Sequence, residues 1–175
     1  NLAIEKAQGS FITFLDCDDW WQSEKLSKQV VLFEDPDIGF CISDYWVENE
    51  LRGKRFICKQ SFNSSSYILD DLLKSYTVGV LTLMIRKQTY DELEEGFNAD
   101  FDIIGDFDLV IRLSAITKVA YIKEALAHYR RHSENLYIQK PMKNVLETED
   151  WYHRTKNNKL ISGSNQFFNI PIIIN

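Results

Sequence analysis

The run Ser10-Phe11-Ile12-Thr13-Phe14-Leu15-Asp16-Cys17-Asp18-Asp19 decides the fold class. Its first six residues are almost continuously apolar, β-branched or aromatic, which is typical of a strand covered by helices on both faces. A helical pattern over residues 2–8 precedes it and ends at Gly9, and an amphipathic pattern over residues 23–34 follows it. Helix, buried strand, acidic turn and helix predict an α/β fold with a mixed, mostly parallel sheet flanked by helices.

The rest of the chain continues this alternation. The pattern at 23–34 predicts a helix that buries Leu26, Val30 and Phe33 on one face. A helix that is apolar nearly all round is expected at 106–116, with Asp106 at its N-cap. The other expected elements are a hairpin of strands at 38–46 and 54–59, helices at 67–75 and 88–95, a buried strand at 79–85, strands at 119–123 and 127–129, and a C-terminal helix at 142–161. Residues 169–175 are apolar and receive no role.

Length, charge and cysteine content exclude several protein classes. A chain of 175 residues with 45% hydrophobic residues is long enough for one globular domain and lacks the composition of a disordered chain. The balance of 20 Lys and Arg against 26 Asp and Glu argues against a nucleic-acid binder, and no apolar run reaches the roughly 20 residues of a membrane span. Cys17, Cys41 and Cys58 are odd in number and widely spaced, which predicts free thiols in a reducing compartment.

The acidic turn after the first strand is the first candidate site. Ligands of open α/β sheets bind outside the carboxyl ends of strands, and Asp16 and Asp18 leave such an end together. Carboxylate oxygens suit Mg²⁺ or Mn²⁺, which commonly bridge one or two carboxylates to a phosphate. The sequence therefore predicts a metal-diphosphate site. An alternative of equal standing is that these acids and Asp19 cap the turn and the following helix.

Two further motifs have both functional and structural interpretations. Asp106, at the start of the buried helix, is placed to accept a proton from a substrate hydroxyl. On spacing alone a capping Asp106 is the better interpretation, with Asp108 in the first turn and Arg112 on its exposed side. The segment Tyr129-Arg130-Arg131-His132 carries two cations and a histidine after a strand. These side chains either solvate the surface or contact a diphosphate and complete a metal site.

The order of these motifs resembles family-2 glycosyltransferases, which are inverting, metal-dependent sugar transferases. The resemblance spans residues 1–137 and rests on Asn1-Leu2-Ala3-Ile4, Phe14-Leu15-Asp16-Cys17-Asp18-Asp19-Trp20-Trp21, Glu24-Lys25-Leu26, Gly105-Asp106-Phe107-Asp108-Leu109, Arg112-Leu113 and Tyr129-Arg130 with His132. It implies a nucleotide-diphospho-sugar transferase fold.

The resemblance also implies roles for individual residues. Asp16 and Asp18 match the Asp-any-Asp motif, in which the first acid lies near the donor's ribose and the second binds Mg²⁺ or Mn²⁺. Asp106 matches the catalytic base, Arg130 a donor-binding residue, and His132 a histidine that approaches the metal or the diphosphate in some relatives. The family commonly has a Glu at the position of Gly105, so this chain lacks one carboxylate beside the base.

The implied partners are a nucleotide-diphosphate sugar donor and a saccharide or lipid-linked acceptor in cell-envelope or surface-polysaccharide synthesis. The implied location is the cytoplasm, with peripheral association at the inner face of the membrane. We expect residues 1–137 to be the C-terminal part of the catalytic domain and residues 138–175 to be a helical extension and tail. Since the chain starts at Asn1 without a Met, the resemblance also implies that βα units for the nucleotide precede it.

Two other functions are compatible with parts of the sequence. A strand that ends in Asp-any-Asp also occurs in haloacid-dehalogenase-like phosphatases, where the first Asp is a nucleophile, but these have no place for the motifs around Asp106 and His132. The second alternative is an incomplete or inactive copy that retains only a binding or structural role. Assays of sugar-nucleotide turnover and of phosphatase activity distinguish the glycosyltransferase from the phosphatase. Thermal unfolding with nucleotide diphosphates and Mn²⁺ tests the second alternative, because an incomplete module is expected to show no stabilisation.

Overall fold

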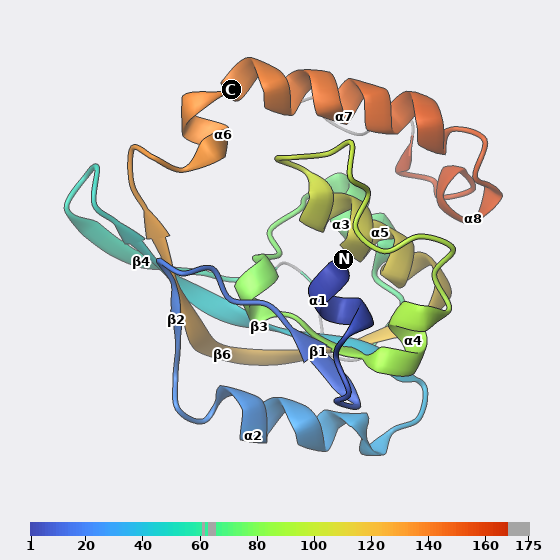
Figure 1. Ribbon diagram of the computed structural model, residues 1–175, viewed down its shortest axis with the longest axis horizontal. Helices are drawn as coiled ribbons and strands as arrows, with labels where there is room; N and C mark the ends of the chain where they lie inside the picture. Colours follow the sequence, from blue (N-terminus) through green and yellow to red (C-terminus); the bar gives the residue numbers. More distant parts are fainter. Residues whose placement is uncertain (61, 63–65, 168–175) are drawn as a thin grey trace.

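The computed structural model describes residues 1–60, 62 and 66–167. They form one mixed sheet with helices on both faces (Figure 1). The sheet order is β1-β5-β3-β6-β2, and β4 pairs with β3. The strands are β1 (Phe11–Thr13), β2 (Trp20–Trp21), β3 (Ile38–Asn49), β4 (Lys54–Cys58), β5 (Met84–Arg86) and β6 (Lys118–Arg131).

The centre of the sheet is the long parallel pair of β3 and β6, in which Ile38 lies opposite Lys118 and Asn49 opposite Arg131. The other pairings among the described strands are antiparallel. The prediction of a mixed, helix-flanked α/β sheet is confirmed, whereas the expectation of mostly parallel pairing is wrong. Parallel neighbours need a long crossover connection. Residues 50–53 alone join β3 to β4, so these two strands pair antiparallel, as the hairpin that the sequence predicts.

Three strands deliver their carboxyl ends to one edge of the sheet. β1 and β3 are both antiparallel to β5, so they run in the same direction, and β6 is parallel to β3. The segment after β1 carries the acidic turn, β3 leads into the hairpin, and β6 leads to His132. The candidate residues of the two strand-end motifs therefore meet at this edge.

Helices cover the two faces of the sheet unequally (Figure 1). One face carries α2 (Lys25–Val30) and the 3-10 turn η1 (Val31–Glu34), where Phe33 joins a small core cluster with Cys41 and Met84. The larger core belongs to the other face and its helices, including α3 (Leu69–Lys74), α5 (Gly105–Ile116) and α7 (Pro141–Thr155). The remaining helical segments are α1 (Leu2–Glu5), η2 (Val80–Thr82), α4 (Lys87–Asp91), α6 (Leu136–Gln139) and α8 (Lys159–Ser162).

The buried face of α2 differs from the predicted one. Leu26 and Val30 are exposed, while Lys25 and Gln29 are fully buried and Phe33 is buried as predicted. Lys25 Nζ lies 2.7 Å from Gln29 Oε1, and Gln29 Nε2 donates to the Thr82 carbonyl at 2.7 Å. These bonds offset the cost of burying two polar side chains. Burial also lowers the pKa of Lys25 to about 8.

Several element boundaries also differ. The apolar run expected as a strand at 79–85 forms η2 and then β5, and the two strands expected within 119–129 are one strand, β6. The C-terminal helix expected at 142–161 is α7 followed by the short α8. Ile104 is the N-cap of α5 and Asp106 its second helical residue, so the predicted capping role of Asp106 is wrong. The tail at 169–175 lies outside the described residues.

Two further features of the described part of the chain concern its helix lengths and its cysteines. No described helix is long and apolar enough to cross a membrane. All three cysteines are free thiols; Cys41 is buried and Cys17 is exposed.

Candidate active site

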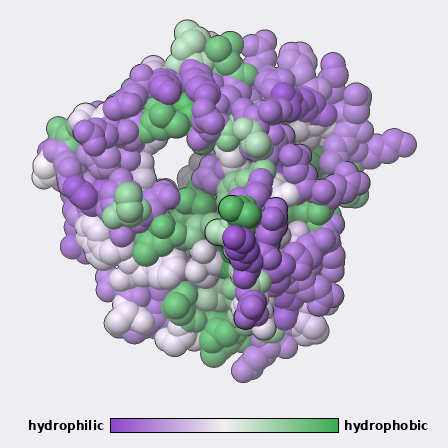
Figure 2. Space-filling view, viewed as in Figure 1, coloured by the Kyte–Doolittle hydropathy of each residue, from purple (hydrophilic) through white to green (hydrophobic). Residues whose placement is uncertain are grey.

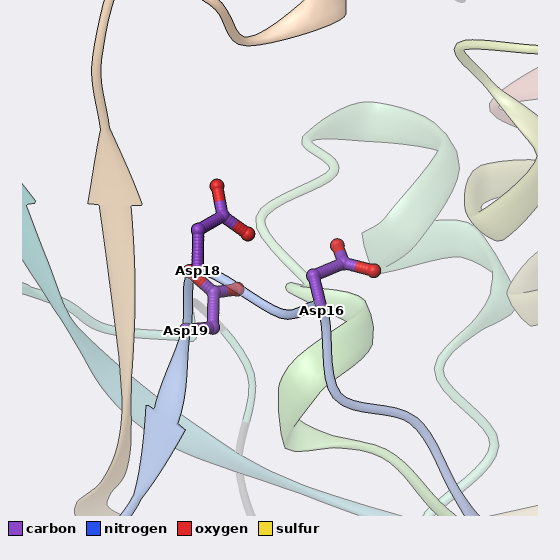
Figure 3. A group of neighbouring side chains, drawn as sticks. All are labelled: Asp16, Asp18 and Asp19. Carbon is purple, nitrogen blue, oxygen red and sulfur yellow. The ribbon is translucent and has the colours of Figure 1, made fainter.

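Three carboxylates gather between β1 and β2. Asp16, Asp18 and Asp19 each offer an oxygen that lies within 4.8 Å of the others. Figure 3 shows the Asp16 and Asp18 carboxylates directed to the same side of the segment that carries them. The structure thus brings the two acids of the predicted motif together and adds Asp19. Such a set of hard oxygen donors fits Mg²⁺ or Mn²⁺.

His132 contacts this group through Asp18. Its Nε2 lies 2.7 Å from Asp18 Oδ2, while its Nδ1 accepts a hydrogen bond from the Glu134 backbone N–H at 3.2 Å. Because Nδ1 accepts, Nε2 carries the hydrogen and donates to Asp18. This bond lowers the pKa of Asp18 and keeps the carboxylate ionised. In this arrangement His132 orients Asp18, and its predicted direct contact with a metal stays a prediction.

The pKa values of Asp16 and Asp19 are raised, in contrast to that of Asp18. Burial raises the pKa of Asp19 to about 6, although its Oδ1 accepts the backbone N–H of Arg130 at 2.9 Å. Burial, together with the Asp18 charge, also raises the pKa of Asp16. Like charges at short range disfavour full ionisation, so this group favours a cation. The Arg130 side chain, predicted to bind donor, pairs with Glu50 Oε1 at 2.8 Å.

A cavity of about 850 Å³ lies at the end of β6, where Arg131, the residue before His132, lines it. Its walls come from the end of α3 and the segment after it, the start of α5, the end of β6, and α6 with α7. Figure 2 shows it as a gap in the molecular surface. The lining side chains that matter below are Tyr45, Tyr76, Asp106, Arg131, Asn144 and Thr148.

Asp106 is the carboxylate that faces this cavity. Burial raises its pKa to about 6, and the charge of Asp16 adds to the rise, whereas the bond from the Phe107 N–H at 2.8 Å opposes it. The charge of Asp16 thus acts on the predicted base, Asp106. A carboxylate with a pKa near neutrality can take up a proton during a reaction and release it afterwards.

A residue of the C-terminal helix α7 supports the start of α5. The carboxylate of Glu147 is buried and accepts three backbone N–H groups that precede the helix, from Asp102 at 3.1 Å, Ile103 at 2.9 Å and Ile104 at 3.2 Å. Donors at a helix start otherwise lack partners. Glu147 therefore fixes the backbone immediately before Asp106.

We expect Glu147→Ala to destabilise the folded chain by at least about 1–3 kcal/mol, the cost of leaving buried donors without partners. Urea unfolding followed by circular dichroism measures this. Glu149→Ala is the matched control, because Glu149 is an exposed residue on the same helix. An equal loss in both variants would contradict a specific role for the three hydrogen bonds.

A buried network joins α5 to α7 one turn later. Asp108 Oδ2 accepts Arg112 Nη2 at 2.6 Å and Nε at 3.0 Å, and its Oδ1 accepts Trp151 Nε1 at 3.0 Å. Arg112 also donates to the Glu95 and Gly96 carbonyls, the latter at 2.6 Å. The expectation that Arg112 lies on the exposed side of this helix is wrong, because the Glu95 and Gly96 carbonyls and Asp108 enclose its guanidinium.

Sequence reasoning named only Asp106 and Arg131 among these cavity residues and did not separate Arg131 from Arg130. Arg131 lines the cavity, and its buried Nε has no hydrogen-bond partner among the described residues. Its neighbour Arg130 instead pairs with Glu50. Successive strand residues point to opposite faces, so the alternation along β6 was a signal for separating the two arginines. No local signal identifies Glu147, because its partners lie more than 40 residues away.

Comparisons with known proteins identify relatives of the chain. The chain is 32% identical over 135 residues to TuaG of Bacillus subtilis (strain 168), a protein named for teichuronic acid biosynthesis, covering 74% of this chain and 50% of TuaG. It is 28% identical over 119 residues to WfaP of Escherichia coli, named a UDP-Glc:alpha-D-GlcNAc-diphosphoundecaprenol beta-1,3-glucosyltransferase, covering 67% and 43%. The chain thus spans about half the length of these curated relatives.

A solved structure has the same fold. Residues 1–349 of S. aureus TarS superpose with a TM-score of 0.65 at 13% identity, over 97% of this chain and 49% of the TarS chain. The family model of glycosyl transferase family 2 matches residues 1–93, more than half of the chain. Motif order, fold and family match lead to one conclusion: the chain belongs to glycosyl transferase family 2.

Proposed function

We propose that this glycosyltransferase moves a sugar from a nucleotide-diphosphate donor to an acceptor hydroxyl with inversion at the anomeric carbon. The observation that carries the proposal is the pairing of two carboxylate sites: the group around Asp18 and the single carboxylate of Asp106. The first suits a cation and a diphosphate, and the second lines the cavity. Donor and acceptor would therefore approach from opposite sides of the sugar being transferred.

The residues act on the acceptor through one proton transfer. The acceptor oxygen forms a bond to the anomeric carbon while the bond from that carbon to the diphosphate oxygen breaks. The hydroxyl proton passes to the Asp106 carboxylate, and the electron pair of the broken bond leaves with the diphosphate. A single displacement of this kind inverts the configuration. The raised pKa of Asp106 favours its role as acceptor of that proton.

The acidic group would hold the divalent cation, Mg²⁺ or Mn²⁺, through Asp18 with Asp16 and Asp19 as neighbours. A bound cation supplies a Lewis acid that offsets the negative charge of the leaving diphosphate. In this chain His132 holds Asp18 ionised, so the carboxylate that the cation needs is already charged at neutral pH. The Arg130 guanidinium would have to leave Glu50 to reach a diphosphate.

Asp18→Ala is expected to abolish the part of donor affinity that depends on Mn²⁺. Removing one of the three carboxylates takes away a ligand whose charge and position are set by His132. Isothermal titration of UDP-glucose with and without Mn²⁺ measures the difference. Asp91→Ala, at an exposed aspartate paired with Lys87 on α4, is the surface control. Unchanged Mn²⁺ dependence in Asp18→Ala would contradict the assignment.

The relatives suggest a first donor and acceptor to test. WfaP and a second E. coli relative, WfgD, are both named for UDP-Glc and GlcNAc-diphosphoundecaprenol. We therefore propose UDP-glucose as donor and a lipid-diphosphate-linked sugar as acceptor, used at the cytoplasmic face of the membrane. The test is transfer of labelled glucose from UDP-glucose to such an acceptor by the full chain with Mn²⁺.

The same assay separates the proposal from the alternatives. Glucosylated lipid supports transfer, and its anomeric configuration reports inversion. If the chain binds UDP-glucose with Mn²⁺ but transfers glucose to none of the acceptors, the result supports a sugar-nucleotide-binding module instead. Membership of glycosyl transferase family 2 argues against the phosphatase alternative.

A further inference from the structure

We propose that the hairpin formed by β3 and β4 is a membrane-docking element that binds an anionic lipid surface. It projects from the sheet on the side away from α8 (Figure 1). Residues 51–57 are all exposed. Binding itself does not depend on the proposed transfer reaction, but its purpose, delivery of the site to a lipid-linked acceptor, rests on the proposed function.

Positive charge is concentrated on β4 and the turn before it, while the end of β3 carries Glu48, which pairs with Arg55 at 3.4 Å, and is followed by Glu50, which pairs with Arg130. Residues 51–59 contain four cations and no acid, although the whole chain has a formal net charge of −6. The cations are Arg52, Lys54, Arg55 and Lys59. An acidic protein presents such a cationic segment to an anionic surface.

Large apolar side chains accompany the charges. Leu51 at the turn is 52% exposed, Phe56 is 47% exposed and Ile57 is 36% exposed. Hydrophobic atoms stand out among hydrophilic ones at this edge of Figure 2. A nucleic acid or an acidic peptide would need the cations but would leave these apolar side chains in water. Cationic and apolar side chains together fit the headgroup and acyl boundary of a bilayer.

An aromatic stack stiffens the base of the hairpin. The Arg55 guanidinium lies 3.7 Å from the centre of the Trp46 ring, and the His128 ring stacks between Trp46 and Trp20. Trp20 itself is 43% exposed. Tryptophan is favoured at the membrane interface, so the stack gives the hairpin a rigid base that is itself suited to lipid headgroups.

The hairpin is joined directly to the candidate site. The Glu50 backbone N–H donates to the Arg131 carbonyl at 3.0 Å, and the Glu50 carboxylate binds the Arg130 guanidinium. Arg131 lines the cavity, and the residue after it, His132, contacts the Asp18 carboxylate. A bilayer bound at the hairpin would therefore lie close to the cavity mouth, where a lipid-linked acceptor would enter.

The test is sedimentation of the full chain with vesicles, without substrate. We expect binding to phosphatidylcholine vesicles that contain phosphatidylglycerol, weaker binding at high salt, and little binding to phosphatidylcholine alone. Arg52→Gln with Lys54→Gln should weaken binding about 25-fold, since each basic residue near an anionic surface contributes about fivefold. Lys156→Gln with Lys159→Gln removes the same charge at exposed positions near α8 and should have a much smaller effect.

A second variant separates lipid from other occupants. Leu51→Ser with Phe56→Ser keeps the charge and should also weaken vesicle binding, while heparin binding stays unchanged. Equal vesicle binding by wild type and both hairpin variants would overturn the proposal, as would no binding by wild type. Lipid-free self-association that the serine variant abolishes would assign the hairpin to a second copy of the chain instead. Because no transfer is measured, failure here leaves the proposed function intact, and failure of transfer leaves this result intact.

Discussion

Asp106→Asn is expected to reduce sugar transfer by about 10²–10⁴-fold, the usual contribution of a positioned general base, while the folded chain becomes more stable at about pH 7.5. The amide keeps the shape of the carboxyl group but cannot take the acceptor's proton. The stability gain follows from the pKa of Asp106, which burial raises to about 6. Because the pKa is higher in the folded chain than the value of 3.8 in the unfolded chain, this carboxyl group stabilises the folded state fully at a pH below 3.8. That stabilisation is lost as the pH rises through about 6.

Three measurements check this prediction. Thermal unfolding at about pH 7.5 should give a higher midpoint for Asp106→Asn than for wild type, and titration calorimetry should show retained donor binding. The kcat/KM of wild type should fall as the pH drops below about 6, because the base becomes protonated. Asp91→Asn serves as the surface control. Full turnover by Asp106→Asn would refute the assignment, and loss of donor binding together with turnover would indicate a structural role instead.

Asp108→Ala is expected to lower the free energy of unfolding by about 3–5 kcal/mol, the usual cost of breaking a buried ion pair. The change leaves the half-buried Arg112 guanidinium without its carboxylate and Trp151 Nε1 without its acceptor. It also removes the hydrogen bond that joins Trp151 of α7 to α5, so near-ultraviolet circular dichroism of Trp151 should weaken. Urea unfolding provides the free energy.

The matched control is Asp100→Ala. Asp100 pairs with Arg154 at 2.6 Å, but 63% of the Asp100 side chain and 47% of the Arg154 side chain are exposed. Exposed pairs contribute at most about 1 kcal/mol. Similar losses in the two variants would show that burial of the Asp108 network is not the cause. Asp108→Asn, which can still accept from Trp151, should fall between them.

The parts of the fold that local pattern determines were predictable. The apolar strand, the acidic turn, the hairpin and the helix that starts before Asp106 all follow from periodicity and turn residues within short windows. The same holds for the juxtaposition of Asp16 and Asp18. Distant partners decide the rest. The run at 79–85 reads as a strand, yet the Leu81 and Thr82 carbonyls accept bonds from Trp21 and Gln29 side chains and the segment turns instead.

The burial of polar side chains could not be predicted from the sequence either. Lys25 has the pattern of a surface residue because its helix also offers Leu26 and Val30. Its burial is stabilised by Gln29 and by the Trp21 ring, whose centre lies 4.3 Å from Nζ. Arg112 looks exposed until the loop carbonyls of Glu95 and Gly96 are brought to it. The long-range partners of Gln29 and Arg112 are backbone carbonyls from other segments. A hydropathy pattern contains no information about such contacts.

The contacts of Glu147 and Trp151 with the start of α5 bear on how catalytic units of this kind can be recombined. A chimera that grafts residues 1–137 onto a foreign C-terminal segment would lose the acceptor of three backbone N–H groups and the partner of Asp108. The exchangeable block therefore extends at least through residue 151. A crossover point placed there would transplant the base with its supporting helix, whereas one placed at residue 137 would separate them.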